Sequence, residues 1–388
     1  VAYGQQVGEV ALKYAAYYQA SSDFPTAVTD AKTAVVHANP RQKIEGLNAW
    51  ASGLISQSEF DEAETLLQQA QELATQQNDL LNESISLLRL GIISYFRGNN
   101  ISARDYYEAS LASARQLRNL PRQAASLINL VAVHYGLGDI SYAKTCGEEA
   151  LAIVKTVGDR ANEAIILNNL GAIYHAIGNL DIAHTYHLEA LYLSQSLQDK
   201  ISESLSANNL GSVLCDQENY IDAIVYAESA LSINKMIGNR VGQGYNLTIR
   251  ANAQQELSNF SDAIQDHKKA IEIRHAIGQD AGTLDNLSEL ARIALTQNNL
   301  MLAQDYTDRI LDWIKENGLD GIEHPIKVYL TCIDTMEATG KKAESLTLLK
   351  SAQKILHEQA DRIGDPEIRQ AYLENVPSHK TINNRAKK

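Results

Sequence analysis

The chain has 388 residues, of which 45% are hydrophobic and 21% are charged, with 22 Gly, 6 Pro and 3 Cys. This composition is typical of a soluble globular protein and excludes collagen-like, disulfide-rich and disordered chains. With 34 Lys and Arg against 47 Asp and Glu, the formal charge of −13 disfavours nucleic acid as a direct partner.

The cysteines and the first residues bear on location. Cys146, Cys215 and Cys332 are widely spaced and form no C-x-x-C pair, which favours free thiols in a reducing compartment. No run approaches the ~20 apolar residues of a membrane span, and no charged segment precedes an apolar core at the start. We therefore expect a cytoplasmic chain with no membrane partner. It begins at Val1 without Met, so we also expect it to be a piece of a longer polypeptide.

A 40-residue repeat organises most of the sequence. One alanine recurs in strict register at Ala63, Ala103, Ala143, Ala183, Ala223, Ala263, Ala303 and Ala343. Such a period predicts tandem repeats. An additional unit precedes them, because Ala27 lies 36 residues before the first ladder alanine. The sequence therefore predicts an atypical first hairpin over residues 1–40 and a repeat array over residues 41–362, about nine units in all.

Each unit is predicted to contain two helices. Apolar residues recur at helical spacing, as in Leu167, Leu170 and Ile173. Glycines that favour left-handed backbone are predicted to end the first helix, and a capping Asn or Asp follows them, in the pairs Gly98-Asn99, Gly138-Asp139 and Gly178-Asn179. We expect Gly158, Gly238 and Gly278 to play the same part between units.

The prolines agree with these boundaries. Pro25, Pro121, Pro325 and Pro366 fall at predicted helix starts, where the missing N–H costs least. Pro40 and Pro377 are predicted to lie in connections instead.

Small residues are predicted to lie where the two helices of a unit meet. With Leu170 counted as position 7, they occupy positions 8, 20 and 27, and an aromatic residue often occupies position 11. This pattern resembles the tetratricopeptide repeat (TPR) from about Val7 to His357. The resemblance implies an all-α, right-handed α-solenoid. The long period is similar to that of kinesin light chain, Pins-type scaffolds, bacterial peptide-pheromone receptors and sensor arms of large bacterial regulators.

The last residues, 363–388, are predicted to form a closing helix and a disordered basic tail. Asp365-Pro366-Glu367 combines a cap, a proline and a first-turn acid, and this helix is predicted to end at Asn375. The segment resembles the one that follows the TPR array in bacterial signalling ATPases and cyclases related to the maltose-regulon activator. That resemblance implies an upstream signalling NTPase domain in the same polypeptide.

The resemblance also implies which residues face the concave groove. In TPR proteins, positions 2, 5, 6, 9, 12 and 13 of a unit point there. Position 6 holds Arg89, Asn129, Asn169 and Asn209, and position 12 holds Tyr95, Tyr135 and His175. Further candidates on this face are Asn168, Asn208, Tyr245, Asn252 and Arg292.

A row of carboxamides suits an extended peptide, because each amide both donates and accepts hydrogen bonds and so clamps backbone without reading side chains. In kinesin light chain and the pheromone receptors, an Asn at the position of Asn129, Asn169 and Asn209 contacts bound peptide. Alternatively, these amides satisfy backbone of the neighbouring unit, the tyrosines pack between units, and Arg89 and Arg292 are solvated.

No sequence motif points to catalysis or to a cofactor. Phosphate-binding, nucleophile-elbow and EF-hand patterns are missing. His184 and His187 lie three residues apart but lack the further ligands of a metal site, and His134 is expected to pack in a hairpin. We therefore predict a non-enzymatic module that binds a peptide or protein in its groove. The alternatives are an assembly scaffold that uses the convex surface and a small-ligand sensor.

Overall fold

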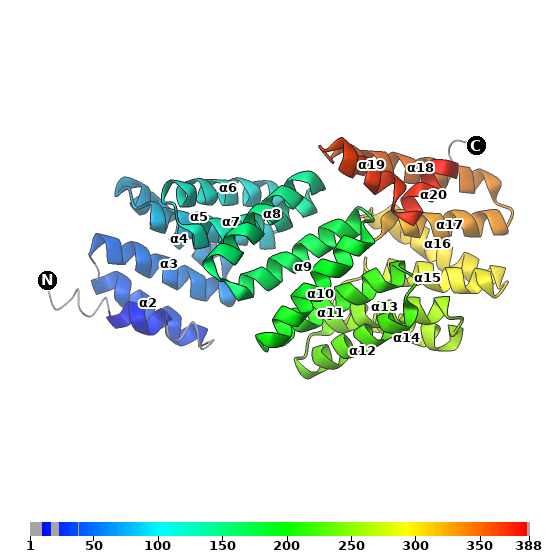
Figure 1. Cartoon of the computed structure of the whole chain (residues 1–388), viewed down its shortest axis with the longest axis horizontal. Helices are drawn as coiled ribbons and strands as arrows, with labels where there is room; N and C mark the ends of the chain where they lie inside the picture. The colour runs from blue at the N-terminus through cyan, green and yellow to red at the C-terminus, as the bar shows by residue number, and fades with distance from the viewer. Residues whose placement is uncertain (1–9, 17–22, 38, 386–388) are drawn as a thin grey trace. The chain divides into compact units, whose positions relative to one another are not determined.

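The computed structural model describes residues 10–16, 23–37 and 39–385, and every regular element among them is an α-helix (Figure 1). This confirms the predicted all-α fold of tandem helical hairpins. The chain divides into two compact units, Val1–Asp159 and Arg160–Lys388. The division falls inside the predicted array 41–362, and each unit is described by itself. No described helix is long and apolar enough to span a membrane.

In the N-terminal unit, consecutive helices pack against each other as hairpins. They are α2 (Phe24–His37), α3 (Pro40–Ser56), α4 (Phe60–Gln76), α5 (Leu80–Phe96), α6 (Asn100–Gln116), α7 (Leu120–Gly136) and α8 (Ile140–Val157).

The C-terminal unit continues the pattern with further hairpins and a tail. Its helices are α9 (Arg160–Ala176), α10 (Leu180–Ser196), α11 (Lys200–Asp216), α12 (Tyr220–Met236), α13 (Arg240–Glu256), α14 (Phe260–Ala276), α15 (Thr283–Thr296), α16 (Leu300–Asn317), α17 (Pro325–Ala338), α18 (Lys342–Asp361), α19 (Pro366–Glu374) and α20 (Pro377–Arg385). Successive first helices of the hairpins, α9, α11, α13, α15 and α17, contact one another.

Small residues lie where the helices of a hairpin meet, as predicted. A Cβ atom added to Gly91 would lie 2.4 Å from the Tyr107 ring, and one added to Gly171 would lie 2.6 Å from the His187 ring. The ladder alanines from Ala63 to Ala303 have no exposed surface. Close helix packing therefore requires these residues.

The last ladder position was predicted wrongly. Ala343 is exposed, and Ser345 is buried in its place. Ala303 is the fourth residue of α16 and Ser345 is the fourth residue of α18, so the register moves by two residues. The longer connection 318–324 before α17 causes this shift.

The turns confirm the predicted glycines and caps. Gly98, Gly138 and Gly178 have φ values of 76°, 80° and 74°. Asn99 and Asp139 accept hydrogen bonds from first-turn N–H groups of α6 and α8. In other turns, within and between hairpins, the same left-handed position is held by residues with a side chain, namely Ser58, Asn78, Arg118, Gln198, Glu218, Ser258 and Asn298.

Two prolines and the tail depart from prediction. Pro40 begins α3 and Pro377 begins α20, where connections were expected. The disordered tail predicted from His379 onward is wrong for residues 379–385, because Ile382 is fully buried and Arg385 lies 2.6 Å from Asp334. Residues 386–388 lie outside the described part. The closing helix α19 is present as predicted, with Asp365 as its cap.

Candidate ligand-binding face

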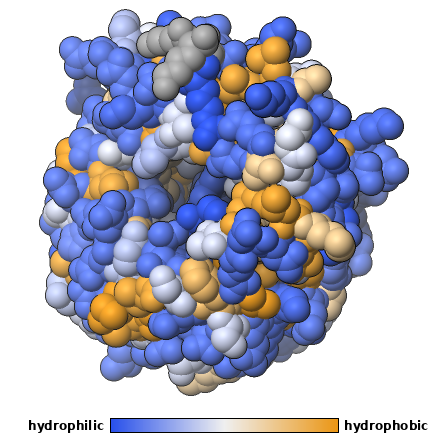
Figure 2. Space-filling model, turned by 90° about the vertical axis from the view of Figure 1, so that its right-hand side faces the viewer, coloured by the Kyte–Doolittle hydropathy of each residue, from blue (hydrophilic) through white to orange (hydrophobic). Residues whose placement is uncertain are grey.

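Most of the predicted ligand-binding residues lie on the first helices of the C-terminal unit. We call the surface formed by α9, α11, α13, α15 and α17 the first-helix face. Side chains on successive first helices form hydrogen bonds and ion pairs with one another across this face. Figure 2 views the molecule from the end where the C-terminal helices lie. Hydrophilic residues cover most of that view, and a hollow opens near its centre.

Asparagine side chains form a connected chain on the first-helix face. Asn246 donates from Nδ2 to Oδ1 of Asn208 at 2.7 Å, and Asn208 donates to Oδ1 of Asn209 at 3.2 Å. Asn209 then donates to Oδ1 of Asn168 at 3.2 Å. The chain fixes the orientation of the amide of Asn209 and leaves it one further N–H and one further lone pair.

Asn169 differs from these amides. Its side chain is half-buried on α9, and no hydrogen bond to it is found among the described residues. It lies one residue beyond Asn168 and one repeat before Asn209, and none of its donors and acceptors is used by the described residues.

Asn168 is a correction to the predicted groove lining. It is 6% exposed, and its Oδ1 lies 2.9 Å from Nδ1 of His187. Burial lowers the pKa of His187 to about 3, with a further contribution from His175 and His184. The ring is therefore neutral near pH 7, and Nδ1–H donates to the amide oxygen. Asn168 positions Asn209 and does not itself face a ligand.

The N-terminal unit holds the remaining predicted residues of position 6. Asn129 donates from Nδ2 to the Ala125 carbonyl at 2.8 Å, which leaves its oxygen available. Tyr95 and Tyr135 are 41% and 43% exposed. Arg89 is half-buried, and no acidic partner is found for it within the described ranges. Burial and the neighbouring charge of Arg122 lower the pKa of Arg89 to about 10.

Ion pairs cross the first-helix face from hairpin to hairpin. His175 Nε2 lies 2.6 Å from Asp216, and Lys327 lies 2.7 Å from the buried Glu289. Arg292 contacts both Glu256 and Glu289 at 2.7 Å. A ligand carboxylate would therefore have to displace two partners from Arg292.

These charges shift one another's titration. Burial alone would raise the pKa of Glu289, but Lys327 and Arg292 hold it well below its ordinary value. The same opposition applies to Asp216, whose pKa is lowered by His175 and Lys327 against the effect of burial. We therefore expect these carboxylates to be ionised at pH 7.

Tyr245 and Asn252 are the remaining predicted residues, and their surroundings differ. Tyr245 is half-buried and stacks against the Arg274 guanidinium at 4.5 Å. Asn252 is half-buried, and its Oδ1 has no hydrogen-bond partner in the described structure. Arg250, two residues before Asn252, binds Asp266 on α14 at 2.7 Å and so belongs inside the hairpin.

One cluster has the spacing of a cation site. Asp285, Glu323 and His324 offer ligand atoms that lie within 4.8 Å of one another. The Asp285 carboxylate already accepts hydrogen bonds from the backbone N–H groups of Glu323 and His324, at 3.1 and 3.0 Å. We therefore assign this cluster to anchoring the connection that leads into α17.

Sequence reasoning missed the ion pairs of the first-helix face. Apart from Lys327, their members lie at unit positions 6, 9, 12 and 13, so opposite charges at those positions in neighbouring units would have been the signal. The packing of His134 was predicted correctly, because this residue is buried and its ring lies 4.3 Å from the ring of Tyr142.

Comparison with known proteins agrees with the helical repeats. Residues 44–116 and 122–196 match one family model described as tetratricopeptide repeat, and residues 205–237 match a second model with the same description. No curated protein shows significant sequence similarity to the chain.

Several solved structures share the fold at low identity. A Rap protein in complex with competence and sporulation factor matches with a TM-score of 0.58 and 13% identity, over 98% of both chains. The quorum sensor NprR from B. thuringiensis matches with a TM-score of 0.61 and 15% identity, over 79% of this chain and 87% of that one.

A third structure is that of a signal transduction ATPase with numerous domains (STAND) and a tetratricopeptide repeat sensor, from Pyrococcus horikoshii. It matches with a TM-score of 0.59 and 18% identity, over 82% of this chain and 55% of that one. Tetratricopeptide repeats thus make up residues 44–116, 122–196 and 205–237 of this chain, and the flanking hairpins repeat their packing.

Proposed function

We propose that the chain is a non-enzymatic module that binds an extended peptide segment on its first-helix face. The observation that carries this proposal is the free carboxamide of Asn169 on α9, with the oriented carboxamide of Asn209 at the same position of the adjoining helix α11. Two such groups, one repeat apart, suit the alternating N–H and C=O groups of an extended backbone. The exposed apolar side chains of Ile165 and Leu205 on the same helices would pack against the side chains of the peptide.

The structural neighbours support this assignment. The Rap structure contains competence and sporulation factor, and NprR is named as a quorum sensor. The STAND protein uses a tetratricopeptide repeat region as its sensor. We therefore propose that this chain is the sensor or regulatory arm of a larger signalling protein with an upstream NTPase domain. Its free cysteines support a cytoplasmic location.

The mechanism follows from the construction in stacked hairpins. Each hairpin contacts only its neighbours, so small changes between hairpins add up along a unit. A peptide that bonds to Asn169 and Asn209 at once favours the spacing of α9 and α11 that suits both contacts. The ligand shifts the population toward that spacing by as much as its affinity for that spacing exceeds its affinity for others.

Binding of a peptide selected from a random library tests the proposal, with fluorescence anisotropy giving Kd. Asn169→Ala and Asn209→Ala are each expected to weaken binding about tenfold, since each removes hydrogen bonds worth about 1.4 kcal/mol together. The control is Asn317→Ala, which removes an exposed carboxamide from the second helix α16. An unchanged Kd for the Asn169→Ala/Asn209→Ala double variant, with melting also unchanged, would exclude this face as the binding site.

The alternative is association of chains through the second helices of the hairpins, and an exposed apolar pair on α12 supports it. Ile221 and Val225 on α12 are 62% and 57% exposed and lie four residues apart on one side of the helix. If this surface mediates association, Ile221→Glu with Val225→Glu will abolish oligomers seen by light scattering and leave peptide binding intact.

A further inference from the structure

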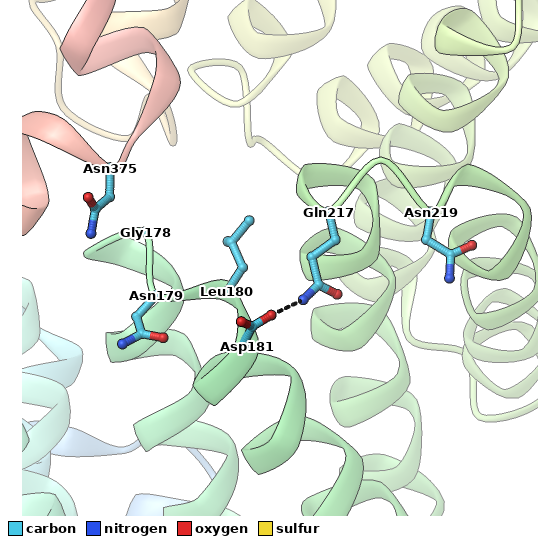
Figure 3. Close-up of a pocket in the computed structure, with 7 residues that line it drawn as sticks. All are labelled: Gly178, Asn179, Leu180, Asp181, Gln217, Asn219 and Asn375. Atoms are coloured by element: carbon cyan, nitrogen blue, oxygen red, sulfur yellow. Dashed lines mark hydrogen bonds between the residues drawn. The ribbon is translucent and has the colours of Figure 1, made fainter.

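The tail helix α19 returns to the first hairpin of the C-terminal unit. A Cβ atom added to Gly178, in the turn between α9 and α10, would lie 2.6 Å from Cβ of Asn375 and 2.9 Å from its carbonyl carbon. Figure 1 shows α19 beside the end of α9, and Figure 3 shows Asn375 next to Gly178. Gly178 therefore serves two needs, since it takes a φ of 74° and leaves room for the tail.

The tail is held much more firmly against α17 and α18 than at Gly178, where the bend between α19 and α20 touches the α9–α10 turn. On one side, Ile382 of α20 is fully buried among residues of α17 and α18. Arg385 forms an ion pair with Asp334, and the Tyr372 hydroxyl donates to Gln359 at 3.0 Å. At Gly178, by contrast, no hydrogen bond or ion pair between Asn375 and the turn is found among the described residues, and the contact is van der Waals alone. The contact at Gly178 is therefore the one that separates first.

A polar pocket of about 760 Å³ opens where the tail meets the hairpin turns. Its lining residues, shown in Figure 3, are Gly178, Asn179, Leu180, Asp181, Gln217, Asn219 and Asn375. Asp181 and Gln217 bond across it at 3.1 Å. The pair His175–Asp216 immediately precedes these turns in the chain, so the tail borders that end of the first-helix face.

We propose that α19 is a strap that joins the last hairpin of the C-terminal unit to the first, and that its release at Gly178 opens the end of the first-helix face beside Asp216. The anchored α20 acts as the fixed end, and the strap opens without unfolding the unit. Its effect on ligand entry rests on the proposed function, whereas the opening itself does not.

We choose Cys215 of α11, whose thiol donates to the Ile249 carbonyl of α13 at 3.7 Å, as the reporter of this opening. It precedes Asp216 and the pocket residue Gln217, and its thiol is half-buried, with a pKa raised to about 12 by burial. The other thiol of this unit, Cys332, is fully buried in the core between α15 and α17. Opening of the strap should therefore expose Cys215 to solvent and leave Cys332 unchanged.

Two glycine variants separate strap release from backbone strain. Gly178→Ala adds a Cβ atom that collides with Asn375, whereas Gly238→Ala adds one at nearly the same φ, 72°, with no atom within 4 Å. Alkylation by N-ethylmaleimide, followed by mass spectrometry of peptides, measures the rate at Cys215. We expect Gly178→Ala to raise this rate about fivefold or more and Gly238→Ala to leave it as in the wild type.

Hydrogen exchange of residues 366–376 gives an independent readout. Gly178→Ala should speed exchange there about tenfold, and Asn375→Gly in the same chain should restore part of the protection, because it removes one of the colliding atoms. Equal effects of Gly178→Ala and Gly238→Ala, or unchanged exchange and alkylation in Gly178→Ala, would overturn the strap. Neither assay uses a peptide, so these outcomes leave the test of Asn169 and Asn209 unaffected.

Discussion

At the scale of single residues, the hairpin turns show how much the fold depends on backbone conformation. Every turn between α3 and α15 places one residue in the left-handed region, whether or not that residue is glycine. A left-handed conformation costs a residue with a side chain about 1–2 kcal/mol. The non-glycine turns therefore store strain that packing of the flanking helices overcomes.

Glu218→Gly tests this strain. Glu218 has a φ of 62° and is exposed. We expect the substitution to raise the free energy of unfolding by about 0.5–1 kcal/mol, because relief of strain exceeds the entropy that glycine gains in the unfolded chain. Urea denaturation measures the change. The reverse substitution, Gly238→Ala, should lower stability by a similar amount, and a destabilised Glu218→Gly would contradict the argument.

Asn168 and Asn169 are adjacent but should behave in opposite ways. Asn168→Ala leaves the buried Nδ1–H of His187 without its acceptor and should cost about 1–3 kcal/mol of folding free energy. Asn169→Ala removes a side chain with no partner in the described structure and should change stability by less than about 0.5 kcal/mol. Chemical denaturation of both variants decides the matter, and equal losses would show that Asn169 also has a structural role.

At the scale of helices, contact distances between the two helices of a hairpin set which small residues are required. A Cβ atom at Gly171 would lie 2.6 to 2.8 Å from three atoms of the His187 ring, whereas one at Gly211 would lie 3.4 Å from its nearest neighbours. The His187 side chain is fully buried, and its Nδ1 is held by the hydrogen bond to Asn168.

Gly171→Ala and Gly211→Ala therefore form a matched pair. We expect Gly171→Ala to cost about 1–3 kcal/mol through overpacking against the ring. Gly211→Ala should be neutral or stabilising by up to about 1 kcal/mol, because alanine favours the helix. Differential scanning calorimetry measures both. Similar melting temperatures for the two variants would contradict the role given to His187.

The start of α17 carries a pH dependence. Burial alone would lower the pKa of His324, but Asp285 and Glu323 raise it to about 9. Since this folded-state value exceeds the unfolded value of about 6.5, the stability from this group is complete below pH 6.5 and is lost as the pH rises through 9. Denaturation across this range should show a smaller loss of stability in His324→Gln than in the wild type. Parallel curves would refute the pairing.

At the scale of the whole molecule, the sequence predicts what each hairpin needs for itself. The period, the ladder alanines and the turn glycines are local requirements, and the structure confirms them except at Ala343. The order of α20 depends instead on one apolar residue, Ile382, within a basic segment. The pairing of Lys327 with Glu289 joins residues of different hairpins, which become neighbours only when the hairpins stack.

For the candidate ligand-binding face, too, the sequence predicts the positions of residues within a unit but not their contacts with other residues. The position of Asn169 within its unit was sufficient to place it on a first helix. The burial of Asn168 was not predictable, because it depends on the bonds to His187 and Asn209. The division after Asp159 was not predictable either, since the 40-residue register continues without a break on both sides of it.

The central claim is that carboxamides on the first helices hold the backbone of a peptide. Chains labelled with nitrogen-15 at asparagine report on it directly, because each side-chain amide gives its own NMR signals. On titration with a selected peptide, we predict shifts in the Asn169 and Asn209 signals and none in the Asn317 signals. Shifts in the Asn317 signals, with the Asn169 and Asn209 signals unchanged, would contradict the claim.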